Sequence, residues 1–374
     1  MRTFYSLILS TNGSDIEKWR TLVNRHSQKD VFFTPEHAMV YERTGGATRK
    51  DFGGEALLFF LGNERDFIIY PFFKRKISEL PFYSILGDES EDWFDIISPY
   101  GYSGPLAYID DSELEVSLWQ SFLNEFHNFC VENNIIAEFA RLHPYFKNHL
   151  VLTKSTDINI EKKSSVVYLE LEQNESQMWK NMTKGSKSSV SKARRSGIEI
   201  RCSSTEDAIE SFYQLYIATM ERNKAKKAYF FSRDFFNDTF QLLGENVRLF
   251  SAWYEDRVIA ASLFLLGDNL VHYYLSGSDA NYLTLSPNNL LLYEAILWAK
   301  SRGFKIMNLG GGYGQNDSLF HFKSSFSKTT ADFYTYSRIH NQTVYERLHR
   351  ARDLYGEQEH ENVIQSDYFP IYRR

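Results

Sequence analysis

The chain has 374 residues, of which 43% are hydrophobic and 24% charged, and this composition predicts a soluble globular protein long enough for two domains. The formal net charge of -6 excludes a protein coated in phosphate-binding surface, although it allows a local basic groove. Because no stretch approaches the ~20 consecutive apolar residues of a membrane span and no signal peptide follows Met1, we expect a cytoplasmic protein.

The first half of the chain predicts one α/β unit. Pro, Gly and aromatic residues crowd the segment 92–106, which predicts packed turns between a strand hairpin and a long helix. The elements expected here are a strand at 3–9, helices at 14–28 and from Thr34-Pro35-Glu36, hairpin strands at 55–62 and 66–73, a helix at 112–133 and a strand at 135–140.

The second half predicts a similar series of elements, preceded by a basic helical region that ends before Gly197. The expected elements are a strand at 166–171, a helical region at 174–194, a strand at 198–203, helices at 205–221 and 233–243, strands at 247–254, 257–266 and 270–278, a helix from Ser286 to Gly303, a strand at 304–309, a strand at 331–339 and a helix near 342–354.

The stretch 286–326 carries the strongest functional signal. Ser286 and Pro287 predict a helix start, and a short apolar strand follows that helix and ends in Gly310-Gly311-Gly312. Such a glycine run lets backbone approach a ligand closely. A polar cluster comes next, where loops at strand ends often carry function: Tyr313, Gln315, Asn316, Asp317, His321 and Lys323.

Both halves share the order strand, paired helices, strand meander, long helix, strand, without a repeat at the residue level. This order predicts two copies of one α/β domain with a cleft between them, and such clefts are preferred ligand sites. The boundaries we expect are 1–155, 156–340 and a C-terminal helix and tail at 341–374.

Several segments resemble the FemA/B/X-like (FemAB) family, whose members are tandem GNAT-like N-acyltransferases. The segments, in chain order, are DIISPYGYSGP (95–105), SKSSVSKARRSGIEI (186–200), YIATMERN (216–223), HYYLSGS (272–278), SPNNLLLYEAILWAKSRGFKIMNLGG (286–311) and FHFKSSF (320–326). The resemblance implies an α/β fold of two GNAT-like domains over nearly the whole chain.

The resemblance also implies transfer of an acyl group, often aminoacyl from a charged tRNA, to an amine of a bacterial cell-wall or surface-glycan precursor. The nucleotide-cradling glycine loop of CoA-dependent GNAT enzymes is absent, since DANYLTLSPNN stands before the long helix. We therefore favour aminoacyl-tRNA over acyl-CoA as co-substrate and expect no tightly bound cofactor. A thioester donor and a non-catalytic binding protein remain alternatives, a peripheral approach to a lipid-linked acceptor stays open, and the oligomeric state is open.

Lys323 matches the lysine that this family places at its acyl-transfer centre, where an ammonium group would stabilise an oxyanion. The competing interpretation is a surface lysine on a short helix. Asp317 and His321 are candidates to accept the proton of the attacking amine. For Asp317 we favour a helix N-cap over catalysis.

The remaining candidates are substrate-binding residues and donor contacts implied by family position. Each of these residues also has a purely structural interpretation. The tyrosines can pack in the core, an arginine can stabilise the end of a helix by its charge, and the basic run can be the solvated face of a helix. The candidates for substrate binding are Arg222, Tyr229, Tyr274, Gly277, Ser286, Asn288, Tyr100 and Tyr102, and those for donor phosphates are Lys192, Arg194 and Arg195.

We expect no metal, because the ten histidines show no ligand spacing. Cys130 and Cys202 are too few and too far apart to predict a disulfide framework, which favours a reducing compartment.

Overall fold

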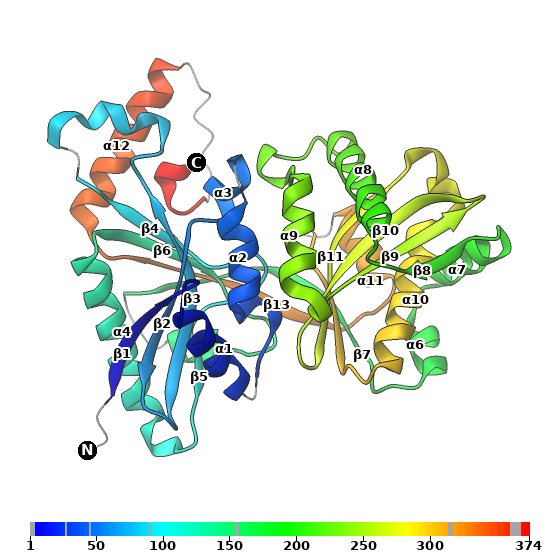
Figure 1. The fold of residues 1–374 in the computed structure, drawn as a ribbon, viewed down its shortest axis with the longest axis horizontal. Helices are drawn as coiled ribbons and strands as arrows, with labels where there is room; N and C mark the ends of the chain where they lie inside the picture. The colour runs from blue at the N-terminus through cyan, green and yellow to red at the C-terminus, as the bar shows by residue number, and fades with distance from the viewer. Residues whose placement is uncertain are drawn as a thin grey trace.

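The computed structural model describes residues 4–26, 28–44, 46–89, 91–153, 157–312, 317–359 and 368–374. Two α/β halves lie side by side and share one sheet (Figure 1). The strands are β1 (Tyr5–Ser10), β2 (Glu55–Gly62), β3 (Phe67–Lys76), β4 (Phe94–Ile97), β5 (Leu106–Tyr108), β6 (Ile135–Arg141), β7 (Asn159–Glu170), β8 (Glu199–Cys202), β9 (Val247–Tyr254), β10 (Arg257–Leu266), β11 (Leu270–Ser278), β12 (Ile306–Gly310) and β13 (Thr330–Ile339).

The helices cover both faces of this sheet (Figure 1). They are α1 (Asp15–Arg25), α2 (Pro35–Arg43), α3 (Gly46–Phe52), α4 (Glu115–Glu132), α5 (His149–Leu152), α6 (Glu175–Asn181), α7 (Lys184–Arg195), α8 (Glu206–Arg222), α9 (Arg233–Leu243), α10 (Pro287–Ser301), α11 (Ser318–Ser324) and α12 (Gln342–Gln358). Short 3₁₀ turns occur at η1 (Val31–Phe33), η2 (Pro81–Glu89), η3 (Ser112–Leu114), η4 (Lys227–Tyr229), η5 (Gly244–Asn246), η6 (Ala280–Leu285) and η7 (Ile371–Arg373).

The strand order repeats from one half to the other. The first half contributes β1-β2-β3-β4-β6 and the second contributes β8-β9-β10-β11-β12, counted from the two outer ends of the sheet. In each half a meander of antiparallel strands leads to a helix and then to a parallel neighbour: α4 joins the parallel pair β4 and β6, and α10 joins β11 and β12. The predicted fold, two GNAT-like α/β units in tandem, is therefore confirmed.

The two central strands cross between the halves. β13 pairs antiparallel with β6 of the first half and with β7, while β7 also pairs with β12 of the second half. α12 then returns to the first half, where it packs beside η2 and β6. The boundaries expected at 155 and 340 stay a prediction, and in space the sheet runs from one half to the other without a break.

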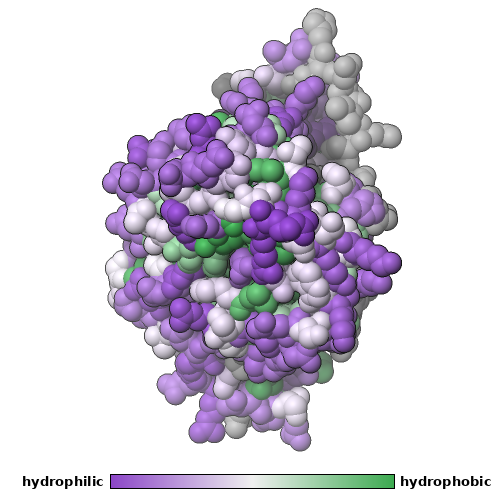
Figure 2. Space-filling model, turned by 90° about the vertical axis from the view of Figure 1, so that its right-hand side faces the viewer, coloured by the Kyte–Doolittle hydropathy of each residue, from purple (hydrophilic) through white to green (hydrophobic). Residues whose placement is uncertain are grey.

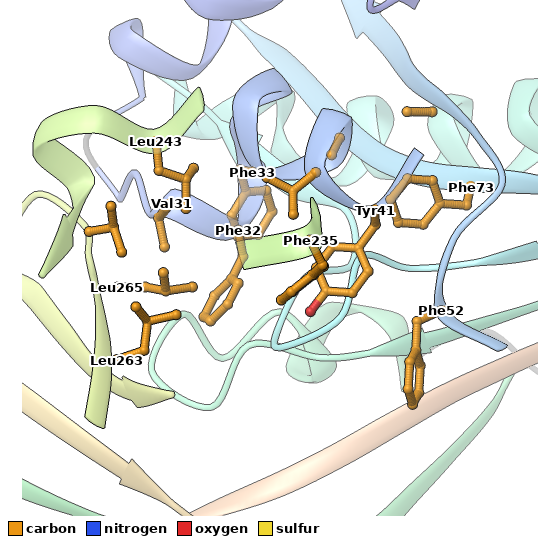
Figure 3. Packing of buried hydrophobic residues seen from close by; sticks show 14 of the residues in the cluster. Val31, Phe32, Phe33, Tyr41, Phe52, Phe73, Phe235, Leu243, Leu263 and Leu265 are labelled. Atoms are coloured by element: carbon orange, nitrogen blue, oxygen red, sulfur yellow. The ribbon is translucent and has the colours of Figure 1, made fainter. Parts of the chain in front are cut away.

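A hydrophobic cluster seals the junction between the halves on one face of the sheet. Phe32 and Phe33 of η1 pack in it together with Leu243, Leu263 and Leu265 of the second half (Figure 3). α2 lies beside α9, and the rings of Tyr41 and Phe235 meet between these two helices at 5.3 Å. Because burying each large apolar side chain contributes ~1.5–3 kcal/mol, this cluster holds the halves as one body.

One predicted helix is two helices in the structure. The region 174–194 is interrupted at Met182 and Thr183, whose backbones are extended, so that α6 ends at Asn181 and α7 begins at Lys184. The Thr183 side chain accepts a hydrogen bond from the backbone N–H of Ser186 at 3.2 Å. The N-cap preference of threonine therefore outweighed the helical pattern on either side.

The surface agrees with the composition. The end of the molecule formed by the second half is mostly hydrophilic, with small separate hydrophobic spots (Figure 2). Within the described ranges, no helix combines the length and apolar character needed to cross a membrane. Cys130 is buried, Cys202 is exposed, and neither forms a disulfide.

Candidate active site at the opening between β11 and β12

The sheet opens at the parallel pair β11 and β12. These strands pair only where Leu270–His272 faces Ile306–Asn308. Beyond that point β11 continues to Ser278 along β10, while β12 continues to Gly310 along β7. The carboxyl ends of two parallel strands therefore diverge, and crevices at such ends are favoured ligand sites in α/β folds.

Lys323 reaches into this opening from α11. Its side chain is 8% exposed, and its Nζ donates a hydrogen bond to the backbone oxygen of Gly311 at 2.6 Å. A Cβ placed on Gly310 would lie 3.2 Å from that Nζ and 3.7 Å from the Tyr102 hydroxyl oxygen. The opening thus brings together α11, the glycine run after β12 and a tyrosine of the first half.

The surroundings of Lys323 change its acidity. Burial lowers the pKa of Lys323 from 10.5 to about 8, and the nearby Asp317 carboxylate acts in the opposite direction. The amine is therefore still mainly an ammonium group at neutral pH, held where water screens its charge poorly.

Local capping and aromatic packing hold Lys323 in place. The Asp317 carboxylate accepts a hydrogen bond from the backbone N–H of Phe320 at 2.8 Å, so this residue forms the favoured N-cap of α11. Phe326 is fully buried, and Phe322 packs edge-on against it at 5.4 Å. His321 lies exposed on the other side of the helix. A role of either Asp317 or His321 in proton transfer stays a prediction, while Tyr313, Gln315 and Asn316 lie outside the described residues.

A buried hydrogen-bond network lies next to the point where the pairing of β11 and β12 ends. Nε2 of His272 and Nε2 of His143 each lie 2.8 Å from the same oxygen of Asp30, and all three side chains are buried. Asn308 joins His272 to the glycine run, because its amide contacts Nδ1 of His272 at 3.1 Å and accepts from the Gly310 N–H at 2.8 Å. The two points where the strand pair ends, His272 and Asn308, are therefore fixed to each other.

The hydrogen bonds of this network determine which ring nitrogen of each imidazole accepts and which one donates. Since the Asn308 oxygen is occupied by Gly310, its NH₂ group faces His272, and Nδ1 of His272 must accept. Nδ1 of His143 likewise accepts from the backbone N–H of Tyr145 at 3.3 Å. Both histidines therefore carry their proton on Nε2 and donate it to Asp30. Burial alone would raise the pKa of Asp30, but His272 and then His143 outweigh it and hold that pKa below its usual range.

Among the residues that the structure describes, the same three residues form the one group that could be considered for a metal. One ligand atom from each of Asp30, His143 and His272 lies within 4.8 Å of the others. A metal binds an unprotonated imidazole nitrogen, whereas both Nε2 atoms carry protons here. The hydrogen bonds therefore satisfy these residues without a cation, and the donor set does not fit a metal centre.

An aromatic cluster extends from the opening toward the first half. Tyr102 lies 5.7 Å from the ring of Phe32, and burial raises its pKa to about 12, while a hydrogen bond with Asn308 lowers it. Tyr274 bonds through its hydroxyl to Tyr41 and lies 6.0 Å from the ring of Tyr100. Tyr229 in turn lies 6.4 Å from Tyr100. The structure thus brings together four predicted substrate-binding residues: Tyr100, Tyr102, Tyr229 and Tyr274.

Two further predicted residues join α8 to β11. Arg222 donates to the backbone oxygen of Ser278 at 2.8 Å, at the end of β11. A Cβ on Gly277 would come within 2.5 Å of the α8 backbone at Leu215 and Tyr216. The structure therefore gives Gly277 a packing function, and ligand binding by either residue stays a prediction.

The last candidates lie on α10 and α7. Ser286 precedes α10 in a left-handed conformation (φ 61°) and makes no side-chain cap, so the predicted helix start is confirmed without the capping bond. The side-chain oxygen of Asn288 is buried without a hydrogen-bond partner. Lys192, Arg194 and Arg195 are exposed on α7, where Arg194 pairs with Glu294 at 2.7 Å.

A pocket of about 490 Å³ also lies at the junction of the halves, beyond Asp30 and away from Lys323. Charged side chains from both halves line it, and two of them form the ion pair between Lys29 and Asp268 at 3.6 Å. Asp30 therefore belongs both to the wall of this pocket and to the hydrogen-bond network with His143 and His272.

Sequence reasoning missed the buried network. Asn308 gave one available signal, because a polar residue inside the apolar strand FKIMNL must find a partner when buried. Asp30, His143 and His272 are separated by more than a hundred residues each, and no spacing connects them. Only the packing of the two halves brings them together.

Comparison with known proteins places the opening in a known kind of domain. The model of an acetyltransferase (GNAT) domain matches residues 180–324, a range that contains β11, β12 and Lys323. The solved structure of FemX superposes with a TM-score of 0.66 at 12% identity, covering 91% of this chain and 99% of that one. The chain has the tandem GNAT fold of an acyltransferase.

Two other solved structures are similar to this chain. A conserved protein of unknown function from Bacteroides thetaiotaomicron matches with a TM-score of 0.54 at 9% identity, covering 91% of this chain and 100% of that one. A tandem GNAT protein from the clavulanic acid biosynthesis pathway matches with a TM-score of 0.49 at 7% identity, covering 91% and 99%. A search of curated protein sequences found no match.

Proposed function

We propose that this tandem GNAT-fold acyltransferase transfers an aminoacyl or other acyl group from an activated donor to an amine of a bacterial cell-wall or surface-glycan precursor. The observation that carries the proposal is the ammonium group of Lys323, buried at the diverging ends of β11 and β12. A buried cation without a full ion pair is costly, and such groups concentrate at functional sites.

The chemistry follows from that ammonium group. The acceptor nitrogen attacks the acyl carbonyl carbon, a C–N bond forms, and the carbonyl oxygen becomes an oxyanion. Lys323 has three N–H donors, of which one is held by the Gly311 oxygen at 2.6 Å, so others can face the oxyanion. When the intermediate collapses, the C–O or C–S bond to the donor breaks and its oxygen or sulfur leaves with the electron pair. The proton lost by the attacking amine balances this leaving group, so that the donor is released as an alcohol or a thiol.

For the donor we propose a charged tRNA. The exposed cations of α7 support this choice, because phosphate backbones bind to such surfaces. The 3₁₀ turn η6 and the left-handed Ser286 stand before α10, in place of the glycine loop of CoA-dependent GNAT enzymes. Both features weigh against a CoA pyrophosphate at the start of α10.

For the acceptor, the support is the resemblance of six segments to FemA/B/X-like proteins together with the shared fold of FemX. The partly buried tyrosines beside Lys323 provide walls for it, since aromatic faces bind sugar and peptide groups with little loss of side-chain entropy.

The donor is tested by titrating uncharged bulk tRNA and CoA into the purified protein at several salt concentrations. We expect the logarithm of the association constant for tRNA to fall linearly with the logarithm of the salt concentration. We expect no CoA binding by calorimetry. Replacing Lys192, Arg194 and Arg195 together by Gln should reduce the salt slope by about 2–3, since each phosphate contact contributes ~0.7–0.9.

The matched control replaces three exposed cations of the first half, Lys18, Arg65 and Lys76, by Gln, which changes the net charge equally. An equal loss of slope in this control would mean that α7 is no specific tRNA surface. Tight CoA binding would overturn the tRNA donor in favour of a thioester, and binding of either without transfer would indicate a non-catalytic binding protein.

A further inference from the structure

The partly buried Arg141 of the first half differs from the buried arginines Arg75 and Arg338 in its side-chain partners within the described part of the chain. Arg75 pairs with the buried Asp95 at 2.8 Å, and Arg338 donates to the Leu123 oxygen at 3.0 Å and pairs with Asp157. Arg141, at the end of β6, has one guanidinium nitrogen, Nη1, that is buried and has no hydrogen-bond partner among the residues that the structure describes.

The position of Arg141 is fixed through its backbone. Its N–H donates to the Ser98 hydroxyl at 3.0 Å, and its carbonyl accepts from the Ser103 N–H at 2.6 Å. The SPYGY segment (98–102) is therefore held against the Arg141 backbone at Ser98 and, just beyond its end, at Ser103. The side chain is not free to turn into solvent without losing its aromatic contacts.

Three aromatic rings surround the guanidinium group. Its Cζ lies 5.4 Å from the ring centroid of Phe139, 5.8 Å from that of Phe52 and 6.0 Å from that of Tyr100. Its charge also lowers the pKa values of Tyr100 and Tyr229, which burial raises. The aromatic walls exclude water, so an anion that reaches the unpaired nitrogen would bind with little competition from solvent.

This group lies at one end of a continuous line of rings that leads to Lys323. Tyr100 contacts Tyr274 at 6.0 Å, Tyr274 contacts Phe32 at 6.3 Å, and Phe32 contacts Tyr102 at 5.7 Å, next to Lys323. Along the chain, the Cα atoms of Tyr100 and Tyr102 are at most ~7 Å apart. Tyr100 of the SPYGY segment therefore contacts Arg141, and Tyr102 of the same segment lies beside Lys323.

We propose that Arg141 binds a carboxylate of the acceptor, and that the reacting amine of the same molecule lies near Lys323. This inference rests on the proposed acyl transfer to an amine. A carboxylate is planar, carries a single charge and matches the edge of a guanidinium group, and the rings of Phe52, Phe139 and Tyr100 leave one nitrogen of that edge unpaired. Arg141 thereby selects acceptors that carry an amine and a carboxylate.

The test measures binding, without donor or turnover, by calorimetry with three probes: Gly-Gly, its C-terminal amide, and O-phosphoethanolamine. We expect the wild-type protein to bind Gly-Gly about 10–100-fold more tightly than the amide, the gain of one charge-assisted contact. Arg141→Gln should abolish this preference while leaving amide binding unchanged, and Arg141→Lys should restore only part of it.

The control is Arg201→Gln, which removes another arginine that lies over an aromatic ring, Trp253 at 4.4 Å, far from the opening on β8. It should keep the full preference. Lys323→Met should also keep it, so that failure of the transfer chemistry and failure of the carboxylate site give different results.

A folded Arg141→Gln protein that still prefers Gly-Gly would overturn the proposal, as would the absence of any Gly-Gly binding by the wild type. Tighter binding of O-phosphoethanolamine than of Gly-Gly would also overturn it, since the anion recognised would then be a phosphate.

Discussion

At the residue scale, the active-site proposal depends on a lysine whose ammonium form the fold destabilises. Lys323 could be selected from the sequence, because FHFKSSF places it among phenylalanines that anchor a short helix. Its burial and its bond to Gly311 depend on where β12 ends, which no local pattern gives. No pattern in the sequence indicated the contacts of Asp30, His143 and Arg141, because the partners of these residues come from distant segments.

The depressed pKa of Lys323 predicts a pH-dependent stability. Because the folded pKa is about 8 and the ordinary value is 10.5, the unfolded chain holds more protons at this site between those pH values. The free energy of unfolding therefore gains from this group as pH rises through that window. Lys323→Met lacks this group. The free energy of unfolding of the wild type, relative to that of Lys323→Met, should therefore rise by up to about 3 kcal/mol from pH 7.5 to 10.5.

The measurement is urea unfolding of both proteins across this pH range. Lys328→Met, at an exposed lysine nearby, serves as control and should run parallel to the wild type. Parallel curves for Lys323→Met as well would show that the amine is not desolvated in solution.

At the scale of elements, most helix and strand identities followed from local patterns, whereas the strand β4 (Phe94–Ile97) lies in the segment 92–106, where turns were expected. The breaks between elements depended on competing signals. The split of the region 174–194 into α6 and α7 is one example, where the cap at Thr183 prevailed. The early end of the β11–β12 pairing is another, since the sequence of β11 continues as a regular strand to Ser278.

The close packing of α8 on β11 predicts a strong effect of a single methyl group. In Gly277→Ala the new Cβ would lie 2.5 Å from backbone atoms of α8 that cannot move independently. We expect this substitution to lower the free energy of unfolding by about 1–3 kcal/mol, as overpacking does.

Gly185→Ala on α7 is the matched control, because nothing lies within 4 Å of its added Cβ. It should leave stability unchanged or raise it by up to ~1 kcal/mol, as alanine favours helix. Equal effects of the two variants in urea unfolding would contradict the packing function of Gly277.

At the scale of the whole molecule, the repeated element order was sufficient to predict the tandem fold. The exchange of β7 and β13 across the centre was not predictable, because the pairing of Thr335 with both Glu161 and Arg141 joins segments almost two hundred residues apart. The shared core around Phe32 and Leu263 likewise appears only when the halves meet.

This shared sheet and core predict that the halves unfold together. Trp179, Trp253 and Trp298 all lie in the second half, so replacing them by Phe leaves tryptophan only in the first half. Fluorescence of this variant should then report on the first half and far-ultraviolet circular dichroism on both. We expect coincident urea midpoints. Separate midpoints would mean that the halves fold as independent domains.

The most direct test of the central claim is steady-state transfer of a labelled acyl group by the wild type, Lys323→Met and Lys323→Arg, beside thermal melts of all three. If the Lys323 ammonium stabilises the oxyanion, Lys323→Met should lower kcat and kcat/KM together by ~10²–10³, and Lys323→Arg should restore little. Because only the protonated form of the Lys323 side chain can stabilise the oxyanion, wild-type kcat should also fall as pH rises past about 8. A well-folded Lys323→Met protein with near-normal kcat would contradict the account.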